Sequence, residues 1–245
     1  MIKRYYYGLL LNLAVIVLSE STTFSQNPDY KSIFSRDWDK AETFLTENEN
    51  WMKHLSDKYD VSFPVAVAVI FPELVRYSAL LDKIEITLLK TLYINLGDDY
   101  ADFSIGPFQM KPSFAETIQE KAGSLKDKIG DQFRLRSQAE NDREYRASIV
   151  KDLEDPGSQF LYLICFLKIC DSTFNLEKAD DNFRVKFLSS AYNCGLNKSF
   201  EKINEMSGKK FFNTKLYATE NYSYSDISLY WYAGYKNKQK PGIDR

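Results

Sequence analysis

Residues 160–170 read FLYLICFLKIC, a run in which every side chain except that of Lys168 is apolar or aromatic. The run is too short to cross a bilayer, because a membrane-spanning helix needs about 20 apolar residues. A helix that is hydrophobic on all sides is instead typical of the centre of a globular protein. Asp155-Pro156 stands just before the run and supplies an acidic N-cap followed by proline at the first helical position. We therefore expect a central buried helix with the other elements packed around it.

The segments on either side of this helix predict a mainly α-helical chain with at most a small β element. Apolar residues recur at helical spacing in Trp38–Tyr59, with one possible break, in Leu80–Leu96, and in Asp181–Tyr192, which Gly195 ends. We also expect a short helix over Ser113–Lys121, entered through Pro112, and a polar, charged helix over Glu140–Leu153 on the surface. The tail after Ser207 is rich in tyrosine and is expected to wrap over the surface. Because the sequence has no internal repeat and no Pro/Gly linker, we expect residues 26–245 to form one domain.

The segment Val65–Phe71 fits two kinds of element. Its β-branched residues and their alternation suit a strand, but a short apolar run also suits a buried helix. Pro72 follows this segment and directly precedes Glu73. Since proline removes a backbone donor and restricts the residue before it, we expect a regular helix to kink or end at this point.

The composition limits the classes of partner. The 245 residues are 44% hydrophobic and 15% aromatic, which is enough for a large core, and the formal net charge is −2. A chain so close to neutrality has no bulk electrostatic attraction to nucleic acid or to an anionic membrane. We therefore expect no nucleic-acid partner.

The first residues predict an export signal. Two basic residues precede the apolar stretch Leu9–Leu18, and Thr23 and Ser25 suit the −3 and −1 positions of a cleavage site. We interpret residues 1–25 as a signal peptide, with an uncleaved amphipathic anchor as the alternative. The mature protein is then expected to be exported, either to the periplasm or into the medium.

The cysteines and the histidine predict no metal centre. The chain has three cysteines, Cys165, Cys170 and Cys194, and one histidine, His54. An odd number of cysteines argues against a disulfide framework. Cys165 and Cys170 are spaced so that they point to different faces of one helix. No cluster of His, Cys and carboxylate residues has the spacing of metal ligands, so we expect neither a metal nor another cofactor.

The first segment with candidate chemistry is residues 71–78, FPELVRYS. Glu73 comes directly after a long apolar run, and apolar surroundings disfavour the charged form of a carboxyl group and raise its pKa. A raised pKa is what a general acid needs near neutral pH. The alternative interpretation is that Glu73 is an acid at a helix end that pairs with Arg76.

The second and third segments are residues 104–113, SIGPFQMKPS, and residues 189–195, SSAYNCG. The second places Gln109 between Phe108 and Met110, where an amide on an apolar wall can exchange hydrogen bonds with sugar hydroxyl or N-acetyl groups. The third places Tyr192 and Asn193 at the C-terminal end of a helix. Each residue alone is equally consistent with a structural role.

Taken in this order, the three segments resemble the motifs of the lytic transglycosylase family with the soluble-type, lysozyme-like domain. That family has a catalytic glutamate, then Gly-Leu-Met-Gln-hydrophobic-x-Pro, then Ala-Tyr-Asn-x-Gly. Glu73 aligns with the catalytic acid, and the other matching residues are Gly106, Gln109, Met110, Pro112, Ala191, Tyr192, Asn193 and Gly195. The resemblance covers about residues 60–200. It implies a helical fold of the goose-type lysozyme and transglycosylase class.

Two features depart from the family pattern. Leu74 follows Glu73 where the family has serine, and Ser78 lies nearby but is not in register with that serine. The predicted helix over residues 80–96 is an insertion between the first and second motifs. This insertion would reshape one rim of a groove, and it leaves Glu85 as an alternative acid.

The resemblance implies that the substrate is the glycan strand of peptidoglycan. Glu73 would protonate the oxygen of the bond between N-acetylmuramic acid and N-acetylglucosamine. The same carboxylate would then accept the proton of the muramoyl 6-hydroxyl as a 1,6-anhydro ring closes. This route needs no second carboxylate, no attacking water and no cofactor.

The resemblance also implies roles for the residues around Glu73. Gln109 would hold sugar or N-acetyl groups, and Asn193 would brace the loop. Tyr192 would position Glu73 or stabilise the charged transition state. Phe108 and tyrosines of the tail would stack on sugar rings. Met110 and Ser78 complete the predicted substrate-binding set.

Three other functions stay open. A lysozyme-like hydrolase would need a second carboxylate about 5–9 Å from the first, and Asp98, Asp99 and Asp102 are the candidates. A non-catalytic envelope protein would use the fold to bind glycan or a component of an envelope machinery. The last is an unrelated helical scaffold in which the motifs match by chance.

Overall fold

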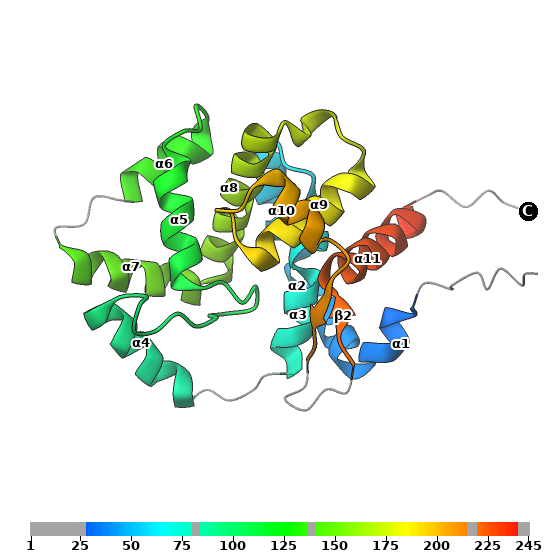
Figure 1. Ribbon diagram of the computed structural model, residues 1–245, viewed down its shortest axis with the longest axis horizontal. Helices are drawn as coiled ribbons and strands as arrows, with labels where there is room; N and C mark the ends of the chain where they lie inside the picture. Colours follow the sequence, from blue (N-terminus) through cyan, green and yellow to red (C-terminus); the bar gives the residue numbers. More distant parts are fainter. Residues whose placement is uncertain (1–27, 80–83, 137–140, 215–219, 240–245) are drawn as a thin grey trace, which may run out of the picture.

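A computed structural model describes residues 28–79, 84–136, 141–214 and 220–239 (Figure 1). The predicted signal peptide, residues 1–25, lies outside these residues. Within them the chain is mainly helical, as the sequence predicts, with a short antiparallel pair of strands. The elements are α1 (Tyr30–Phe34), α2 (Arg36–Lys58), α3 (Phe63–Ala79), α4 (Ile84–Leu96), α5 (Pro112–Ala122), α6 (Lys128–Arg136), α7 (Asp142–Glu154), α8 (Pro156–Phe174), the 3-10 helix η1 (Leu176–Lys178), α9 (Asp181–Cys194), α10 (Phe200–Met206), β1 (Lys210–Phe212), β2 (Tyr222–Ser223) and α11 (Tyr224–Gln239).

Helix α8 is the predicted central helix. It starts as expected, because the carboxylate of Asp155 accepts a hydrogen bond from the backbone N–H of Ser158 at 2.7 Å. Tyr162–Leu167 is buried on every side of the helix. Helices α5, α6 and α7 pack against α8 from one side, and α2 and α3 from the other (Figure 1). Cys165 and Cys170 are both buried and free, as small apolar core residues are.

Helix α3 resolves the ambiguity of Val65–Phe71 in favour of a helix. The helix continues through Pro72 to Ala79, so of the two outcomes expected at this point, a kink or an end, the end is excluded. An interior proline costs about 3 kcal/mol. Each fully buried Val, Ile or Phe side chain contributes about 1.5–3 kcal/mol, and the whole segment Val65–Phe71 is at most 1% exposed. Packing against α2, α9 and α11 therefore outweighs the local effect of the proline.

The tyrosine-rich tail does not wrap the surface, and this prediction is corrected. The strands β1 and β2 pair with Lys210 opposite Ser223, and α11 then packs against both α3 and α9. Trp231 of α11 stacks on Phe71 of α3 with ring centroids 5.4 Å apart. The tail thus completes the core, because its aromatic residues have a buried apolar face to pack against.

The remaining elements follow the predicted pattern in part. Helix α2 is continuous over the predicted Trp38–Tyr59 segment, without the break that was allowed for. Helix α4 starts at Ile84, inside the predicted insertion, and packs against α7. Helices α6 and α10 are short and were not predicted. Of the helices in the described ranges, none has both the length and the apolar character needed to span a membrane.

Candidate active site

A cavity of about 900 Å³ brings the three predicted segments together. It is bounded by α3, by the loop before α5, by α5 and α7, and by the end of α9. All three segments contribute lining residues, among them Glu73, Arg76, Gln109, Met110, Tyr192 and Asn193. Residues far apart in the chain thus share one concave surface, which is the usual setting of an active site.

Glu73 lies inside α3 with its carboxyl group at the cavity. The residue is only 4% exposed, because the turns before it are buried on all sides. Burial raises the pKa of Glu73 to about 7, while Arg76 and Tyr224 limit the rise by favouring the charged form. A carboxyl group with this pKa is protonated in half of the molecules near neutral pH, which suits a general acid.

Arg76 pairs with Glu73, as the alternative interpretation of the sequence expects. Its Nη1 atom donates to Oε1 at 3.1 Å and to Oε2 at 3.0 Å of the same carboxylate. The two residues are one helical turn apart in the interior of α3, so Glu73 is not at a helix end. The pairing does not cancel the effect of burial, since the pKa of Glu73 stays raised.

The loop before α5 is fixed to α8 by the buried side chain of Gln159. Its amide Nε2 donates to the carbonyl of Ile105 at 2.8 Å and also to that of Leu153. Its Oε1 accepts from the N–H of Phe108 at 3.0 Å. Gly106 has φ +67°, and a Cβ atom there would stand 2.1 Å from Nε2 of Gln159, so the close approach requires glycine.

Gln109 occupies the tip of this loop and lines the cavity. It has φ +50°, a conformation that non-glycine residues seldom adopt. Its side-chain Nε2 donates back to the carbonyl of Gly106 at 2.8 Å. This bond holds the amide in place, and its Oε1 has no hydrogen-bond donor among the described residues. Gln109 can therefore accept a hydrogen bond from a ligand without losing its own support.

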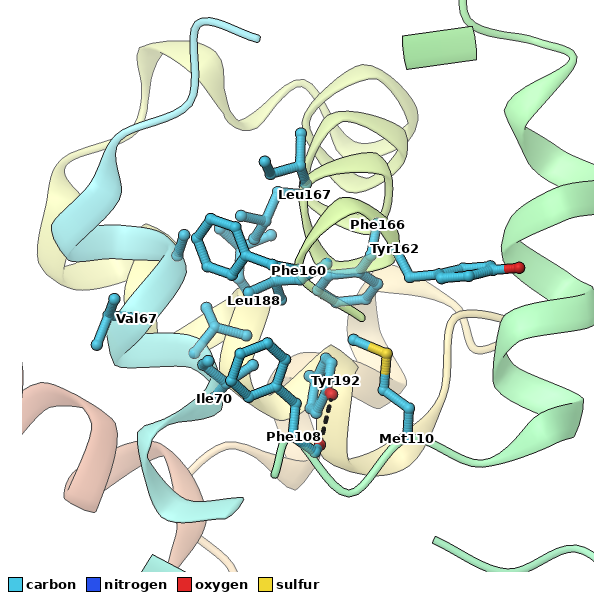
Figure 2. Close-up of a cluster of buried hydrophobic side chains, with 14 of the residues drawn as sticks. Val67, Ile70, Phe108, Met110, Phe160, Tyr162, Phe166, Leu167, Leu188 and Tyr192 are labelled. Atoms are coloured by element: carbon cyan, nitrogen blue, oxygen red, sulfur yellow. Dashed lines mark hydrogen bonds between the residues drawn. The ribbon is translucent and has the colours of Figure 1, made fainter. Parts of the chain in front are cut away.

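Tyr192 joins the end of α9 to the loop. Its hydroxyl donates to the carbonyl of Phe108 at 2.8 Å (Figure 2). Burial raises the pKa of Tyr192 well above its ordinary value, and the charge of Glu73 acts in the same direction. Tyr192 is thus a neutral side chain whose pKa depends on the charge of Glu73. Its hydroxyl stabilises the loop that carries Gln109.

Phe108 does not face a ligand, and its predicted stacking on sugar is corrected to a packing role. Its ring is 0% exposed and points into the core with Ile70 and Phe160 (Figure 2). Gln159 and Tyr192 hold its backbone on either side, so the ring is drawn inward as the loop docks.

The other predicted binding residues differ in accessibility. Met110 lines the cavity but is only 1% exposed, so it contributes to the wall. Asn193 is exposed at the cavity rim. The side chains of Ser78 and of the alternative acid Glu85 lie outside the described part of the structure.

Sequence reasoning missed Tyr224, Gln159 and Glu116. The hydroxyl of Tyr224 donates to the carbonyl of Val69 at 3.1 Å and lowers the pKa of Glu73. The signal was present as a tyrosine-rich tail, but nothing in the tail shows which tyrosine reaches α3. Gln159 carried no signal, because it lies at the start of an apolar helix.

Several other carboxylates stand near the cavity. Asp98 and Asp102 line it and Asp99 does not. Asp102 is engaged by Lys111 at 3.0 Å and by the hydroxyl of Ser113 at 2.8 Å. Glu116 accepts a hydrogen bond from Tyr93 at 2.5 Å, and burial raises its pKa. Of the described carboxylates, none contributes to the pKa shift of Glu73.

No group of three or more His, Cys, Asp and Glu side chains in the described ranges could hold a metal ion. No protein-family model, no curated protein and no solved structure matches this chain.

Proposed function

We propose that this protein is a peptidoglycan lytic transglycosylase with a lysozyme-like helical domain. The observation that carries the proposal is the buried carboxyl group of Glu73, held in one cavity with Gln109 and Tyr192. These three residues come from the motifs that resemble the family. A solvent-exposed Glu73, or one far from the other two residues, would have argued against this function.

The reaction begins with the protonated form of Glu73. Its proton passes to the glycosidic oxygen as the bond from C1 of N-acetylmuramic acid to that oxygen breaks. The 6-hydroxyl oxygen of the same sugar then bonds to C1, and its proton passes to the carboxylate of Glu73. One carboxyl group thus acts first as an acid and then as a base, and water does not enter.

The surrounding groups support this use of Glu73. Positioned acid–base catalysis contributes about 10²–10⁴-fold, so binding and orientation must supply the rest. Gln109 offers an acceptor at the loop tip, and Asn193 offers an amide at the rim. Tyr192 and Gln159 fix the loop from two helices, which keeps the acceptor of Gln109 at a constant place.

A hydrolase is the second candidate function, because further carboxylates line the cavity, among them Asp98 and Glu116. Asp98 is exposed at the wall, and Glu116 is half-buried with a raised pKa. Either would have to direct a water molecule to C1. We prefer the transglycosylase because the three sequence motifs resemble that family.

The predicted signal peptide is consistent with this substrate, since peptidoglycan lies outside the cytoplasm. We propose that the mature chain acts in the periplasm or after secretion. An amino-terminal sequence of the protein recovered from cell fractions tests this, and a start near residue 26 is expected.

Digestion of purified peptidoglycan followed by mass spectrometry tests the activity. Wild type is expected to release 1,6-anhydromuropeptides, and Glu73→Gln is expected to release none. Asp99→Asn is the matched control, because it removes a carboxylate that does not line the cavity. Reducing-end products that disappear in Glu116→Gln or Asp98→Asn would establish the hydrolase. Absence of any product from the wild type, on intact and on stem-stripped strands, would exclude both enzymes and leave a glycan-binding protein.

A further inference from the structure

Arg76 is placed to bind more than Glu73. Only Nη1 of its guanidinium contacts the carboxylate, at 3.0 and 3.1 Å from its two oxygens. Within the described residues, Nε and Nη2 have no acceptor. The side chain is 27% exposed and lines the cavity. Two N–H donor groups of a permanent cation therefore remain for a ligand, directly beside the proposed acid.

A cation–π contact with Phe212 of β1 holds the guanidinium of Arg76 in position. The guanidinium lies over the ring of Phe212 with its central carbon 4.5 Å from the ring centroid. A cation on an aromatic face is held without using its hydrogen-bond donors. Nε and Nη2 can therefore meet a second acceptor while Nη1 keeps its contact with Glu73 and the guanidinium keeps its contact with Phe212 of β1.

The charges that line the cavity favour binding of an anionic ligand group at the end where Arg76 lies. The wall formed by α5, α7 and the loop after α4 carries Asp98, Glu116, Glu120 and Asp142. Three other cations line the cavity: Lys111 pairs with Asp102, Arg146 donates through Nε to the carbonyl of Ile94, and Lys198 lies on the loop after α9. Of the four, Arg76 is the one that contacts the carboxylate of Glu73. A carboxylate on a ligand is thus repelled by the acidic wall and attracted to the end at Arg76.

We propose that Arg76 recognises a carboxylate carried by the glycan, namely the free lactyl carboxylate of a muramic acid whose stem peptide has been removed. This inference rests on the proposed function and narrows its substrate to peptide-free strands. In stem-bearing strands the same lactyl group is an amide and carries no charge. A charge-assisted hydrogen bond in a half-buried site corresponds to about tenfold to hundredfold in affinity.

Binding of this carboxylate also favours the protonated form of Glu73. The groups that act on Glu73 are Arg76 of its own helix and Tyr224 of α11, and Tyr192 of α9 responds to its charge. Burial keeps both tyrosines neutral, so Arg76 is the charged group among them. A ligand carboxylate on the free donors brings a second negative charge to the same cation, so Arg76 favours the ionised form of Glu73 less and Glu73 takes up a proton.

The test compares two substrates that differ in one group. Peptide-free strands are prepared by amidase digestion, and half of them are converted to the lactyl methylamide. The wild type is expected to cleave the carboxylate form at least about tenfold faster by kcat/KM. Arg76→Gln is expected to bring this ratio close to one, and Arg76→Lys to keep part of it. Arg143→Gln, an exposed arginine of α7 outside the cavity, is the matched control and is expected to keep the full ratio.

The pH profile separates recognition from a structural role of Arg76. In the wild type, the basic limb of kcat on the carboxylate substrate should lie above that of kcat/KM, since the first reports the complex and the second the free enzyme. On the methylamide substrate the two limbs should coincide. Equal cleavage of both substrates by the wild type, or a ratio that survives in Arg76→Gln, would overturn this inference and leave the transglycosylase intact. Failure of the wild type on both substrates would instead count against the proposed function.

Discussion

The hydroxyl of Tyr192 and the carbonyl of Phe108 form a 2.8 Å hydrogen bond that ties the end of α9 to the loop carrying Gln109. Tyr192→Phe removes the donor and leaves the carbonyl buried without it, which costs about 1–3 kcal/mol. We expect the free energy of unfolding to fall by that amount and kcat/KM to fall as well. Urea denaturation and glycan digestion measure the two effects. Tyr100→Phe, at a residue that is 66% exposed, is the control. An equal loss of stability and activity in that variant would show that the bond from Tyr192 to Phe108 has no special role.

The activity should decline on the basic side of neutrality. In the proposed reaction Glu73 acts first as an acid, and burial raises its pKa to about 7. Above that pH the protonated fraction falls, so kcat/KM should drop about tenfold for each further pH unit. Initial rates of anhydro-product release between pH 5 and 9 give the profile. A flat profile through pH 9 contradicts the assignment of Glu73 as the acid.

The stability of the protein should depend on pH through the same group. The pKa of Glu73 is higher in the folded protein, about 7, than the ordinary value of 4.5. The folded state therefore holds the proton more tightly, and the stabilisation is full below pH 4.5 and is lost as the pH rises to 7. The difference in unfolding free energy between wild type and Glu73→Gln should change by about 3 kcal/mol over this range, in favour of the variant.

Urea denaturation of both proteins at half-unit pH intervals measures this change. Glu144→Gln, which removes an exposed carboxylate of α7, is the control and should run parallel to the wild type. A constant difference between wild type and Glu73→Gln would show that the carboxyl group titrates alike in the folded and unfolded chains.

The hydroxyl of Tyr224 should tune the acid. It lowers the pKa of Glu73, so Tyr224→Phe should raise that pKa and move the basic limb of the rate profile to higher pH. The control is Tyr222→Phe, whose hydroxyl bonds to Glu220 on the surface. An unchanged limb in Tyr224→Phe, with the fold intact by circular dichroism, would mean that the hydroxyl serves only the carbonyl of Val69.

The contact between Gly106 and Gln159 should be intolerant of a methyl group. In Gly106→Ala the new Cβ would stand 2.1 Å from Nε2 of Gln159, and φ is +67°, so both the loop and its anchor must shift. We expect loss of glycan cleavage and a lower melting temperature. Gly208→Ala is the matched control, since φ is +83° there and nothing lies within 4 Å of the added atom. An equal loss in both variants would attribute the effect to the backbone conformation alone.

The elements that the sequence predicts well are those with local signals. The start of α8 is encoded by Asp155-Pro156, and its burial by the unbroken apolar run. In α3 the same lack of polar residues removed the periodicity that distinguishes a helix from a strand, and only packing decided between them. Pro72 gave a true local signal that the tertiary contacts of Val65–Phe71 outweighed.

In the candidate site too, the residues that lie in local motifs were predicted, and those that act only through tertiary contacts were not. Glu73, Gln109 and Tyr192 lie in short motifs and were found in the sequence. The inward turn of Phe108 depends on Gln159, which reaches it from another element through a side chain with no motif around it. Tyr224 acts on Glu73 from the far end of the chain, a relationship that only the folded arrangement of α11 on α3 creates.

The stacking of Trp231 on Phe71 means that a helix far along the chain completes the surroundings of Glu73. Without α11, the face of α3 that it covers would be open to water, and the loss of solvation that raises the pKa of Glu73 would be smaller. The acidity of this one side chain therefore reports whether α11 has docked on the rest of the fold.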